Sequence, residues 1–374
     1  MAKASTEEDF FVEQSEASKI KARIVFNYFV TWASIIGSTA SKIGYLDFFC
    51  GPGKYEDGNE STPLLILKKA VEVPKIGKSL VTIFQDSNVD YIDRLRKCVA
   101  EIDGIKTLKY APYIEAQTMD EEVVKQLKKI ELIPSLIFID PFGYKGLSKD
   151  LLGTAIKDWG CDCIFFFNYN RINAAITNPA FTDNVNLIFG EDIANELRAK
   201  VESLNPELRQ KLVLEKLALA LSKVKGKFKI EFKFYKEDSE KTSHFLILIT
   251  KHARGYEVMK EVMAKLCDTD EGIPTYEYRP LKERKATGDM FAKTTGKLFD
   301  LGETLKTTYK GKKKTVITIY REHNVGTPFI LSNYKKALMM LEGKGEITVD
   351  VPAASRRKIK GELTLGDDRL ITFK

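Results

Sequence analysis

Short apolar runs alternate with longer amphipathic stretches between residues 43 and 167. The apolar runs have the length of buried strands and lie at residues 43–49, 80–85, 107–113, 135–139 and 161–167. The amphipathic stretches lie between them, at residues 63–71, 89–102, 120–130 and 149–157. This alternation predicts a doubly wound, Rossmann-like α/β fold, in which helices cover both faces of a parallel sheet.

The segments on either side extend this pattern. Residues 1 to about 40 predict a helix, with an apolar stripe made of Ile20, Ile24, Phe26–Tyr28, Trp32 and Ile35. We expect the basic residues Lys19, Lys21 and Arg23 to lie away from this stripe. A helical stretch at 191–222 is followed by two further predicted strands, at 227–235 and 245–250. Residues 1–267 are therefore assigned to one α/β domain.

The pattern changes in the last quarter of the chain. Residues 268–302 are polar and contain Pro274, Pro280, Gly288 and Gly296, which indicates a linker or a flap. Two predicted helices follow, at 315–323 and 332–343. After them come residues 345–351, a basic turn, and alternating strand residues at 361–374. Helices followed by a two-stranded ribbon predict a winged helix-turn-helix domain at residues 303–374.

Composition narrows the class of protein. The chain is 44% hydrophobic and 30% charged, has a net charge of +7, and has no apolar run of the ~18 residues that a membrane span needs. The polar start predicts a cytoplasmic protein without a signal segment. The five cysteines are scattered, and neither Cys161-x-Cys163 nor the three histidines have a spacing typical of metal ligands, so we expect no metal site.

The segment Asp47-Phe48-Phe49-Cys50-Gly51-Pro52-Gly53 joins the end of the first predicted strand to a glycine turn. Glycines in such a turn let the backbone approach a ligand, either a dinucleotide or S-adenosylmethionine. A dinucleotide requires a helix directly after the turn, but here an acidic loop delays the helix to about Pro63. Acids suit a ligand with a sulfonium and an ammonium, so we expect S-adenosylmethionine, contacted by Asp47, Phe49, Gly51 and Gly53. A plain tight turn is the alternative.

A second acid ends the next predicted strand, at Asp86. A carboxylate at this position can accept hydrogen bonds from both hydroxyls of a ribose. The alternative is that Asp86 only caps the helix that begins near Val89. We expect Asp86 to bind the cofactor.

The predicted strand at 135–139 ends in Asp140-Pro141-Phe142-Gly143. Ligands bind at this edge of doubly wound sheets. Asp140 and the carbonyl of Pro141 can accept hydrogen bonds from a planar amine, and Phe142 can stack on its ring, so these three are the expected catalytic residues. The alternative is a structural turn. Gly143 and Tyr144, together with Asn168 and Arg171 after the next predicted strand, are expected to bind the substrate.

These motifs together resemble the three-Cys-motif partner (TcmP) family. The resemblance rests on Y-L-D-F-F-C-G-P-G-K-Y-E-D-G at 45–58, T-P-L-L-I-L at 62–67, F-I-D-P-F-G-Y-K-G-L at 138–147 and H-F-L-I-L-I-T-K-H-A-R-G-Y-E-V-M-K-E-V-M at 244–263. It extends to about Leu266, and the tail resembles the winged helix often attached to that family. It implies a class I S-adenosylmethionine-dependent methyltransferase and a partner protein encoded nearby. The chain departs from the family pattern at residues 60–63.

Two wider similarities bear on the substrate. Residues 140–143 resemble the D-P-F-G of tRNA guanine-N2 dimethyltransferases and the D-P-P-[YF] of methyltransferases that act on base amino groups. Phe49 is similar in position to the aromatic residue of D-x-F-x-G-x-G in nucleic-acid methyltransferases. Both imply methylation of an exocyclic amino group of a base.

Basic residues in the tail support the hypothesis that the substrate is a nucleic acid. We expect Asn333, Lys335 and Lys336 to be exposed at the start of the second predicted helix of the winged domain, and Arg356, Arg357 and Lys358 on its wing. Cations in these places contact phosphates, although many winged helices bind only protein. Three functions remain open: methylation of a nucleic-acid base, cofactor-dependent regulation without turnover, and methylation of a partner protein.

Overall fold

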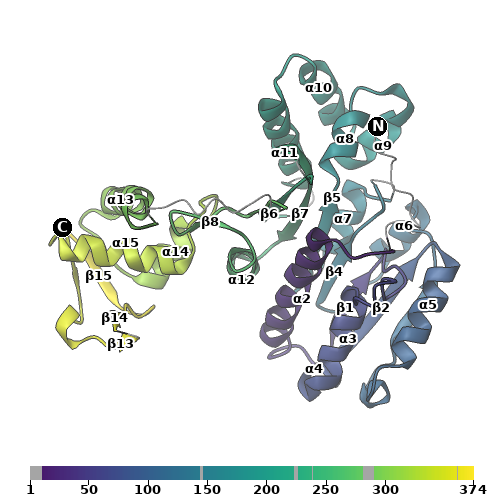
Figure 1. Cartoon of the computed structure of the whole chain (residues 1–374), viewed down its shortest axis with the longest axis horizontal. Helices are drawn as coiled ribbons and strands as arrows, with labels where there is room; N and C mark the ends of the chain where they lie inside the picture. Colours follow the sequence, from purple (N-terminus) through teal and green to yellow (C-terminus); the bar gives the residue numbers. More distant parts are fainter. Residues whose placement is uncertain (1–10, 144–145, 223–225, 238, 281–289, 360) are drawn as a thin grey trace. The chain divides into compact units, whose positions relative to one another are not determined.

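The computed structural model describes residues 11–143, 146–222, 226–237, 239–280, 290–359 and 361–374. The chain divides into two compact units (Figure 1). The first comprises residues 1–263 and 278–280, and the second comprises residues 264–277 and 281–374. Each is described by itself.

The first unit contains the largest sheet of the described residues. Its strands are β1 (Ile43–Asp47), β2 (Leu80–Asp86), β3 (Tyr113–Ala116), β4 (Ser135–Ile139), β5 (Asp162–Phe167), β6 (Phe228–Tyr235), β7 (Thr242–Thr250) and β10 (Glu277–Tyr278). Their order is β10-β6-β7-β5-β4-β1-β2-β3. Strands β1 to β5 pair in parallel, and β7 is antiparallel to both β5 and β6. This order confirms the doubly wound fold.

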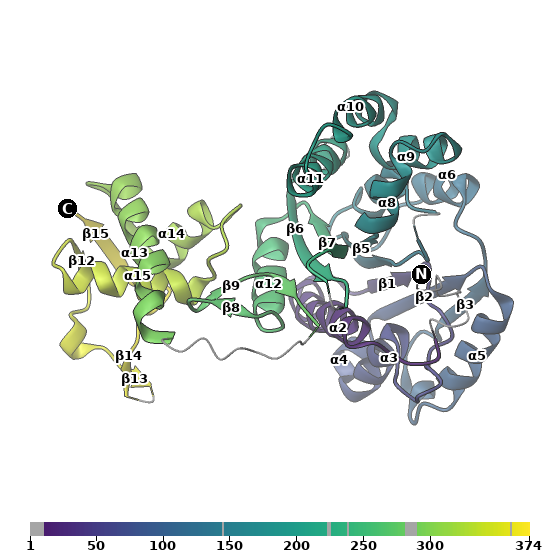
Figure 2. The same cartoon turned by 45° about the horizontal axis from the view of Figure 1, so that its top comes forward.

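Helices cover both faces of this sheet (Figure 2). One face carries α2 (Glu16–Ile36), α3 (Thr62–Glu72), α4 (Pro74–Gly77) and α5 (Val89–Ala100). The other carries α6 (Glu121–Lys129), α7 (Lys149–Ala155), α8 (Tyr169–Ala175), the 3-10 turn η2 (Pro179–Phe181), α9 (Thr182–Phe189), α10 (Glu191–Val201) and α11 (Pro206–Ser222). Helix α12 (Ala253–Ala264) follows β7.

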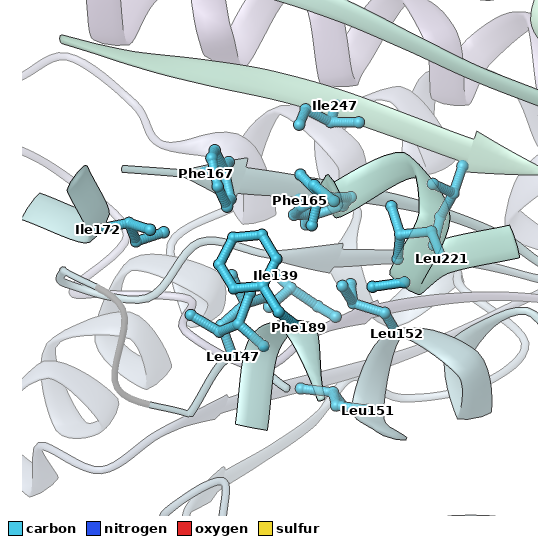
Figure 3. Packing of buried hydrophobic residues seen from close by; sticks show 14 of the residues in the cluster. Ile139, Leu147, Leu151, Leu152, Phe165, Phe167, Ile172, Phe189, Leu221 and Ile247 are labelled. Atoms are coloured by element: carbon cyan, nitrogen blue, oxygen red, sulfur yellow. The ribbon is translucent and has the colours of Figure 1, made fainter. Parts of the chain in front are cut away.

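Side chains alternate across the sheet, as strand geometry requires. Leu46, Ile137 and Phe165 belong to a large buried apolar cluster with residues of α7 and α9. Figure 3 shows Phe165 in this cluster near Leu152 of α7 and Phe189 of α9. Tyr45 points to the opposite face, where its ring meets Phe29 of α2 edge to face, with a centroid distance of 5.6 Å. The odd-numbered residues of β1 therefore face α2.

One predicted strand is wrong. Instead of a strand at residues 107–113, the structure has a 3-10 helix η1 (Ile105–Thr107) and a short strand β3 that begins only at Tyr113. The N–H of Lys109 donates to the carbonyl of Gly77, the last residue of α4, at 3.1 Å, so this N–H is not available to pair with β2.

The second unit is a winged helix-turn-helix domain, as predicted. It contains α13 (Met290–Tyr309), α14 (Val316–His323) and α15 (Leu331–Gly343), a sheet in the order β11 (Lys313–Thr315), β15 (Leu370–Phe373), β12 (Ile347–Val349), the 3-10 turn η3 (Ala353–Ser355) and a wing hairpin of β13 (Lys358–Ile359) and β14 (Glu362–Leu363). Leu305, Val316, Leu338 and Ile371 belong to its separate core.

The region expected to be a linker or a flap contains regular structure. Strands β8 (Thr269–Asp270) and β9 (Ile273–Pro274) form a hairpin, and α13 begins at Met290. Leu301, Leu305 and Tyr309 recur every four residues, which places them on one face of α13 within the core of the second unit. The expected boundary at residue 303 therefore lies within this helix.

Among the described residues, every helix is too short or too polar to cross a bilayer.

Candidate functional site

Three carboxylates meet at the carboxyl edge of the sheet because of strand register. Asp47 ends β1, and its partners across the sheet are Phe84 of β2 and Phe138 of β4. Asp86 and Asp140 lie two residues beyond those partners, so all three acids project to the face that carries α2. Asp47 is only 1% exposed and Asp86 only 8% exposed. The structure thus brings together the three acids that the sequence predicted.

Backbone amides hold two of these carboxylates in place. The N–H of Phe49 donates to Oδ1 of Asp47 at 3.2 Å. The N–H of Gly51 donates to Oδ2 of Asp86 at 3.0 Å, and the N–H of Asn88 donates to its Oδ1 at 3.0 Å. The backbone of Ser87 also contributes a hydrogen bond to Asp86. Each carboxylate has about four lone-pair positions, so Asp86 keeps some acceptor capacity.

The cap of helix α5 is Asn88. Its Oδ1 accepts the N–H groups of Asp90 and Tyr91, at 3.0 and 3.2 Å. Because Asn88 caps α5, the cap does not explain why residue 86 is an acid. Asp86 instead links the end of β2 to the glycine turn.

Burial and mutual repulsion make the carboxylate cluster costly. Burial raises the pKa of Asp47 well above its ordinary value, and the charges of Asp140 and Asp86 raise it further. Burial also raises the pKa of Asp86. Hydrogen bonds from the backbone oppose both shifts. A cation placed among these groups would relieve the repulsion, so the site favours a positively charged ligand.

Lys21 of α2 already supplies one cation. Its Nζ donates to Oδ2 of Asp140, and the side chains of the two residues are only 10% and 20% exposed. Nζ also lies 4.9 Å from the centroid of the Phe166 ring. Burial lowers the pKa of Lys21, but the charges of Asp140, Tyr55 and Asp47 and the hydrogen bond to Asp140 together outweigh burial and leave that pKa above its ordinary value. Lys21 is therefore an ammonium inside the site.

The prediction that Lys21 lies away from the buried stripe is wrong. The buried residues of α2 include Ser18, Lys21, Ala22 and Val25. These are spaced by three, one and three residues, which is the spacing of a single helical face. The spacing of these residues indicates that Lys21 lies on the buried face, although lysine is a residue type that usually faces solvent.

The glycine turn has the backbone conformation that the sequence predicts, but its glycines pack against side chains of the protein. Gly51 and Gly53 have φ of +64° and +87°, which favours glycine. A Cβ on Gly51 would lie 2.8 Å from Cζ of Phe11, and a Cβ on Gly53 would lie 2.8 Å from Cδ1 of Leu95 in α5. Both missing side chains are thus explained by close packing within the protein. Any contact with a ligand must come from other atoms of these residues.

Residues 11–14 lie against the loop that follows the turn. The N–H of Glu56 donates to the carbonyl of Phe11 at 2.9 Å, and the N–H of Gln14 donates to Oδ2 of Asp57 at 2.9 Å. Glu60 pairs with Lys68 of α3 at 2.6 Å. Asp57 and Glu60 therefore take part in local structure. The acids that lie at the carboxyl edge of the sheet are Asp47, Asp86 and Asp140.

The Asp140-Pro-Phe-Gly turn forms one surface with Arg171. Pro141 and Gly143 are buried, whereas Phe142 is 38% exposed. The Arg171 guanidinium lies 4.8 Å from the centroid of the Phe142 ring, and a Cβ on Gly143, with φ of +98°, would lie 2.9 Å from Nη1 of Arg171. Tyr144 lies outside the described residues. Arg171 thus occupies one face of the ring that was expected to stack on substrate.

Asn168 and His244 complete the surroundings. Oδ1 of Asn168 accepts the N–H of Arg171 at 3.2 Å and caps α8, so Asn168 orients that helix. His244 of β7 lies between the rings of Phe166 and Phe234, at centroid distances of 4.5 and 4.4 Å. Burial lowers the pKa of His244 well below its usual value, and the Lys21 charge lowers it further, so His244 is neutral. Among the described residues, no three His, Cys, Asp or Glu side chains are grouped as metal ligands.

The cations expected on the winged domain differ in exposure. Lys336, Arg357 and Lys358 are exposed. Lys335 pairs with Asp367 at 2.5 Å. Arg356 contradicts the prediction of an exposed wing residue, since its side chain is 3% exposed and pairs with Glu342 of α15.

Asn333 is also buried, contrary to expectation. Its Oδ1 accepts the N–H of Ile330 at 3.0 Å, and its Nδ2 donates to the carbonyl of Gly272 at 3.2 Å. These bonds hold the start of α15 against the hairpin of β8 and β9. Asn333 is therefore a structural residue of the second unit.

Comparison with known proteins identifies the second unit by sequence. Residues 277–354 match the family model of the GMT-like wHTH domain. No curated protein matches the chain.

Solved structures give more distant likenesses. Protein LPL1258 from Legionella pneumophila has 12% identity and a TM-score of 0.38, covering 67% of this chain and 92% of that one. The O-methyltransferase from Bacillus cereus in complex with SAH has 12% identity and a TM-score of 0.33, covering 64% and 83%. The rRNA methylase from Streptococcus thermophilus has 7% identity and a TM-score of 0.29, covering 59% and 94%. These values are too low to transfer any activity to this chain.

The buried pair of Lys21 and Asp140 generates a stability prediction. Asp140→Ala leaves a buried ammonium without its partner and should lower the free energy of unfolding of the first unit by about 3–5 kcal/mol. The double variant Lys21→Met/Asp140→Ala removes both charges and should recover most of that loss. Trp32 and Trp159, the two tryptophans of the chain, lie in the first unit, so their fluorescence during urea unfolding measures this unit. Equal loss in the single and double variants would show that the pair does not stabilise the fold.

Proposed function

We propose that this protein is an S-adenosylmethionine-dependent methyltransferase that acts on an exocyclic amino group of a nucleic-acid base. The observation that carries the proposal is the convergence of Asp47, Asp86 and Asp140 at the carboxyl edge of the sheet. That edge is where doubly wound folds bind ligands. The resemblance to the TcmP family supports the proposal and remains part of it.

The residues present fit the cofactor by their chemistry. A cluster of buried carboxylates suits a ligand that carries a sulfonium and an ammonium. Asp86 keeps some acceptor capacity for ribose hydroxyls after its bonds with backbone N–H groups. Asp47 would face the positively charged methionine end, and Phe49 would provide apolar contact beside it. When bound, the cofactor would supply a methyl group on its sulfonium.

The acceptor side would depend mainly on positioning. Asp140 and the carbonyl of Pro141 would accept the two N–H bonds of a planar amine, which frees its lone pair from conjugation and aims it at the methyl carbon. The nitrogen gains one carbon bond and must lose one proton, which Asp140 is placed to accept. Holding the reactants in line is sufficient for a large part of the rate.

The winged domain supplies the argument for a nucleic-acid substrate. Lys336, Arg357 and Lys358 are exposed cations on the second helix and the wing, the two parts with which such domains contact DNA or RNA. A base within a duplex would have to be flipped out to reach Asp140. Phe142 keeps 38% of its surface exposed for stacking.

Cofactor binding can be tested at Asp86. Asp86→Ala should weaken binding of S-adenosylhomocysteine by about 1–3 kcal/mol, the cost of losing a buried polar contact. The matched control is Asp90→Ala, which removes an exposed acid from the first turn of the adjoining helix. Isothermal calorimetry measures both. Equal affinity in wild type and Asp86→Ala would exclude Asp86 from the ribose site.

Turnover can be tested with a labelled methyl group. The wild-type protein should transfer the label to total RNA or DNA, and Asp140→Asn should reduce transfer by about 10²–10³-fold, as expected when a group that stabilises the transition state is removed. Tryptophan fluorescence must first show that this variant is folded. Label in protein alone would instead indicate a protein methyltransferase. Cofactor binding without transfer would favour regulation without turnover.

The winged domain generates a prediction about salt dependence. The triple variant Lys336→Gln/Arg357→Gln/Lys358→Gln should weaken nucleic-acid binding and reduce the slope of log affinity against log salt by roughly one per lost phosphate contact. The control replaces three exposed lysines of the first unit, Lys75, Lys125 and Lys211. Fluorescence anisotropy over a salt series measures both slopes. If the two triple variants behave alike, the winged domain is not the phosphate-binding surface.

A further inference from the structure

We propose that Lys21 is a positioning residue whose ammonium occupies the place on Asp140 that the acceptor amino group takes, so that substrate must displace it. This inference rests on the proposed function. It adds a residue that no motif identified.

The geometry fixes where Lys21 can act. Helix α2 is tied to the sheet by Tyr28, whose hydroxyl donates to Oδ2 of Asp162 in β5 at 2.7 Å. The backbone at position 21 is therefore held in place. The four-carbon stem of lysine nevertheless lets Nζ move while the helix stays fixed. Lys21 can release Asp140 without any rearrangement of the fold.

Lysine ammonium and acceptor amine would compete for the same atoms. Both are N–H donors, and Nζ of Lys21 already bonds to Oδ2 of Asp140. Nζ also lies against the face of Phe166, at 4.9 Å. An aromatic amine could use the same two groups, because a carboxylate accepts its N–H and an aromatic ring lies against its face. Lys21 thus makes the interactions with Asp140 and Phe166 that we propose for a base.

Charge gives a reason for this arrangement. The groups that interact electrostatically with Asp140 are Tyr45 and Asp47 from β1, Tyr55 from the loop after β1 and Lys21 from α2. Without a cation, Asp140 would be a half-buried acid beside another acid. While Lys21 contacts Asp140, its positive charge reduces the negative potential of the carboxylate at the place where the acceptor nitrogen becomes positive during methyl transfer. When an acceptor displaces Lys21, the negative potential of Asp140 is restored at that place.

This leads to a charge selectivity that can be measured without any nucleic-acid substrate. Sinefungin carries an ammonium where S-adenosylmethionine carries its sulfonium methyl, whereas S-adenosylhomocysteine is neutral at that position. The sinefungin ammonium would compete with Lys21 for Asp140. Removing the lysine charge should therefore improve sinefungin binding more than it improves S-adenosylhomocysteine binding.

Calorimetry with wild type, Lys21→Met and Lys21→Arg tests the proposal. We expect Lys21→Met to raise the affinity for sinefungin about tenfold relative to S-adenosylhomocysteine, and Lys21→Arg to keep the wild-type ratio. Lys21→Met retains the apolar stem, so a merely structural lysine would change both affinities by the same factor. An unchanged ratio in Lys21→Met would overturn the proposal and leave the proposed function intact.

A reciprocal variant keeps the proposal falsifiable if Lys21→Met does not fold. Asp140→Asn retains the shape of the side chain but removes its charge, and it should lower sinefungin affinity about tenfold relative to S-adenosylhomocysteine. No change in this ratio would show that Asp140 does not receive an ammonium at the methyl position. If wild type binds neither compound, the proposed function itself fails, and the role of Lys21 fails with it.

Discussion

The close approach of three carboxylates at one edge of a parallel sheet is the constraint on which the site depends. Strand register places Asp47, Asp86 and Asp140 on the same face, two of them almost wholly buried. Burial raises the pKa of Asp47 and of Asp86, and the charges of Asp140 and Asp86 raise that of Asp47 further. Backbone amides and Lys21 offset part of this cost.

Much of the first unit could be predicted from the sequence, because its strands and helices have different apolar periods. Strands β1, β2, β4 and β5 were predicted to within a few residues, and the strand ends located all three acids. Strand β3 was misplaced because its four residues are half-exposed and carry almost no apolar signal. The antiparallel insertion of β7 between β5 and β6 also could not be predicted, since it depends on pairing between residues distant in the chain.

The residues that were misjudged share one cause. Lys21 and Arg356 were assigned to solvent by residue type, yet each is buried against a carboxylate from another element. Asn333 was assigned to solvent in the same way, but it hydrogen-bonds to the hairpin of β8 and β9. For Lys21 the spacing on α2 indicated the buried face, whereas for Arg356 nothing in the run of basic residues separates the first arginine from the second. Long-range partners decide such cases, and a single sequence does not reveal them.

Lys21 changes how the acceptor motif should be understood. The sequence predicts that Asp140, Pro141 and Phe142 contact a planar amine, with Asn168 and Arg171 on the same rim. In the structure the Asp140 carboxylate accepts a hydrogen bond from the Lys21 ammonium, and the Phe142 ring lies against the Arg171 guanidinium. The Asp140 carboxylate and the Phe142 ring, which the sequence predicts to contact a base, are therefore each in contact with a cation of the protein. Each of these contacts resembles one that an amino-bearing ring would make, a donor on a carboxylate and a planar group on an aromatic face. On the proposed function, a base would replace the contact of Lys21 with Asp140 and the contact of Arg171 with Phe142 by similar contacts of its own. Only a ligand that makes both contacts at once would therefore gain free energy on binding.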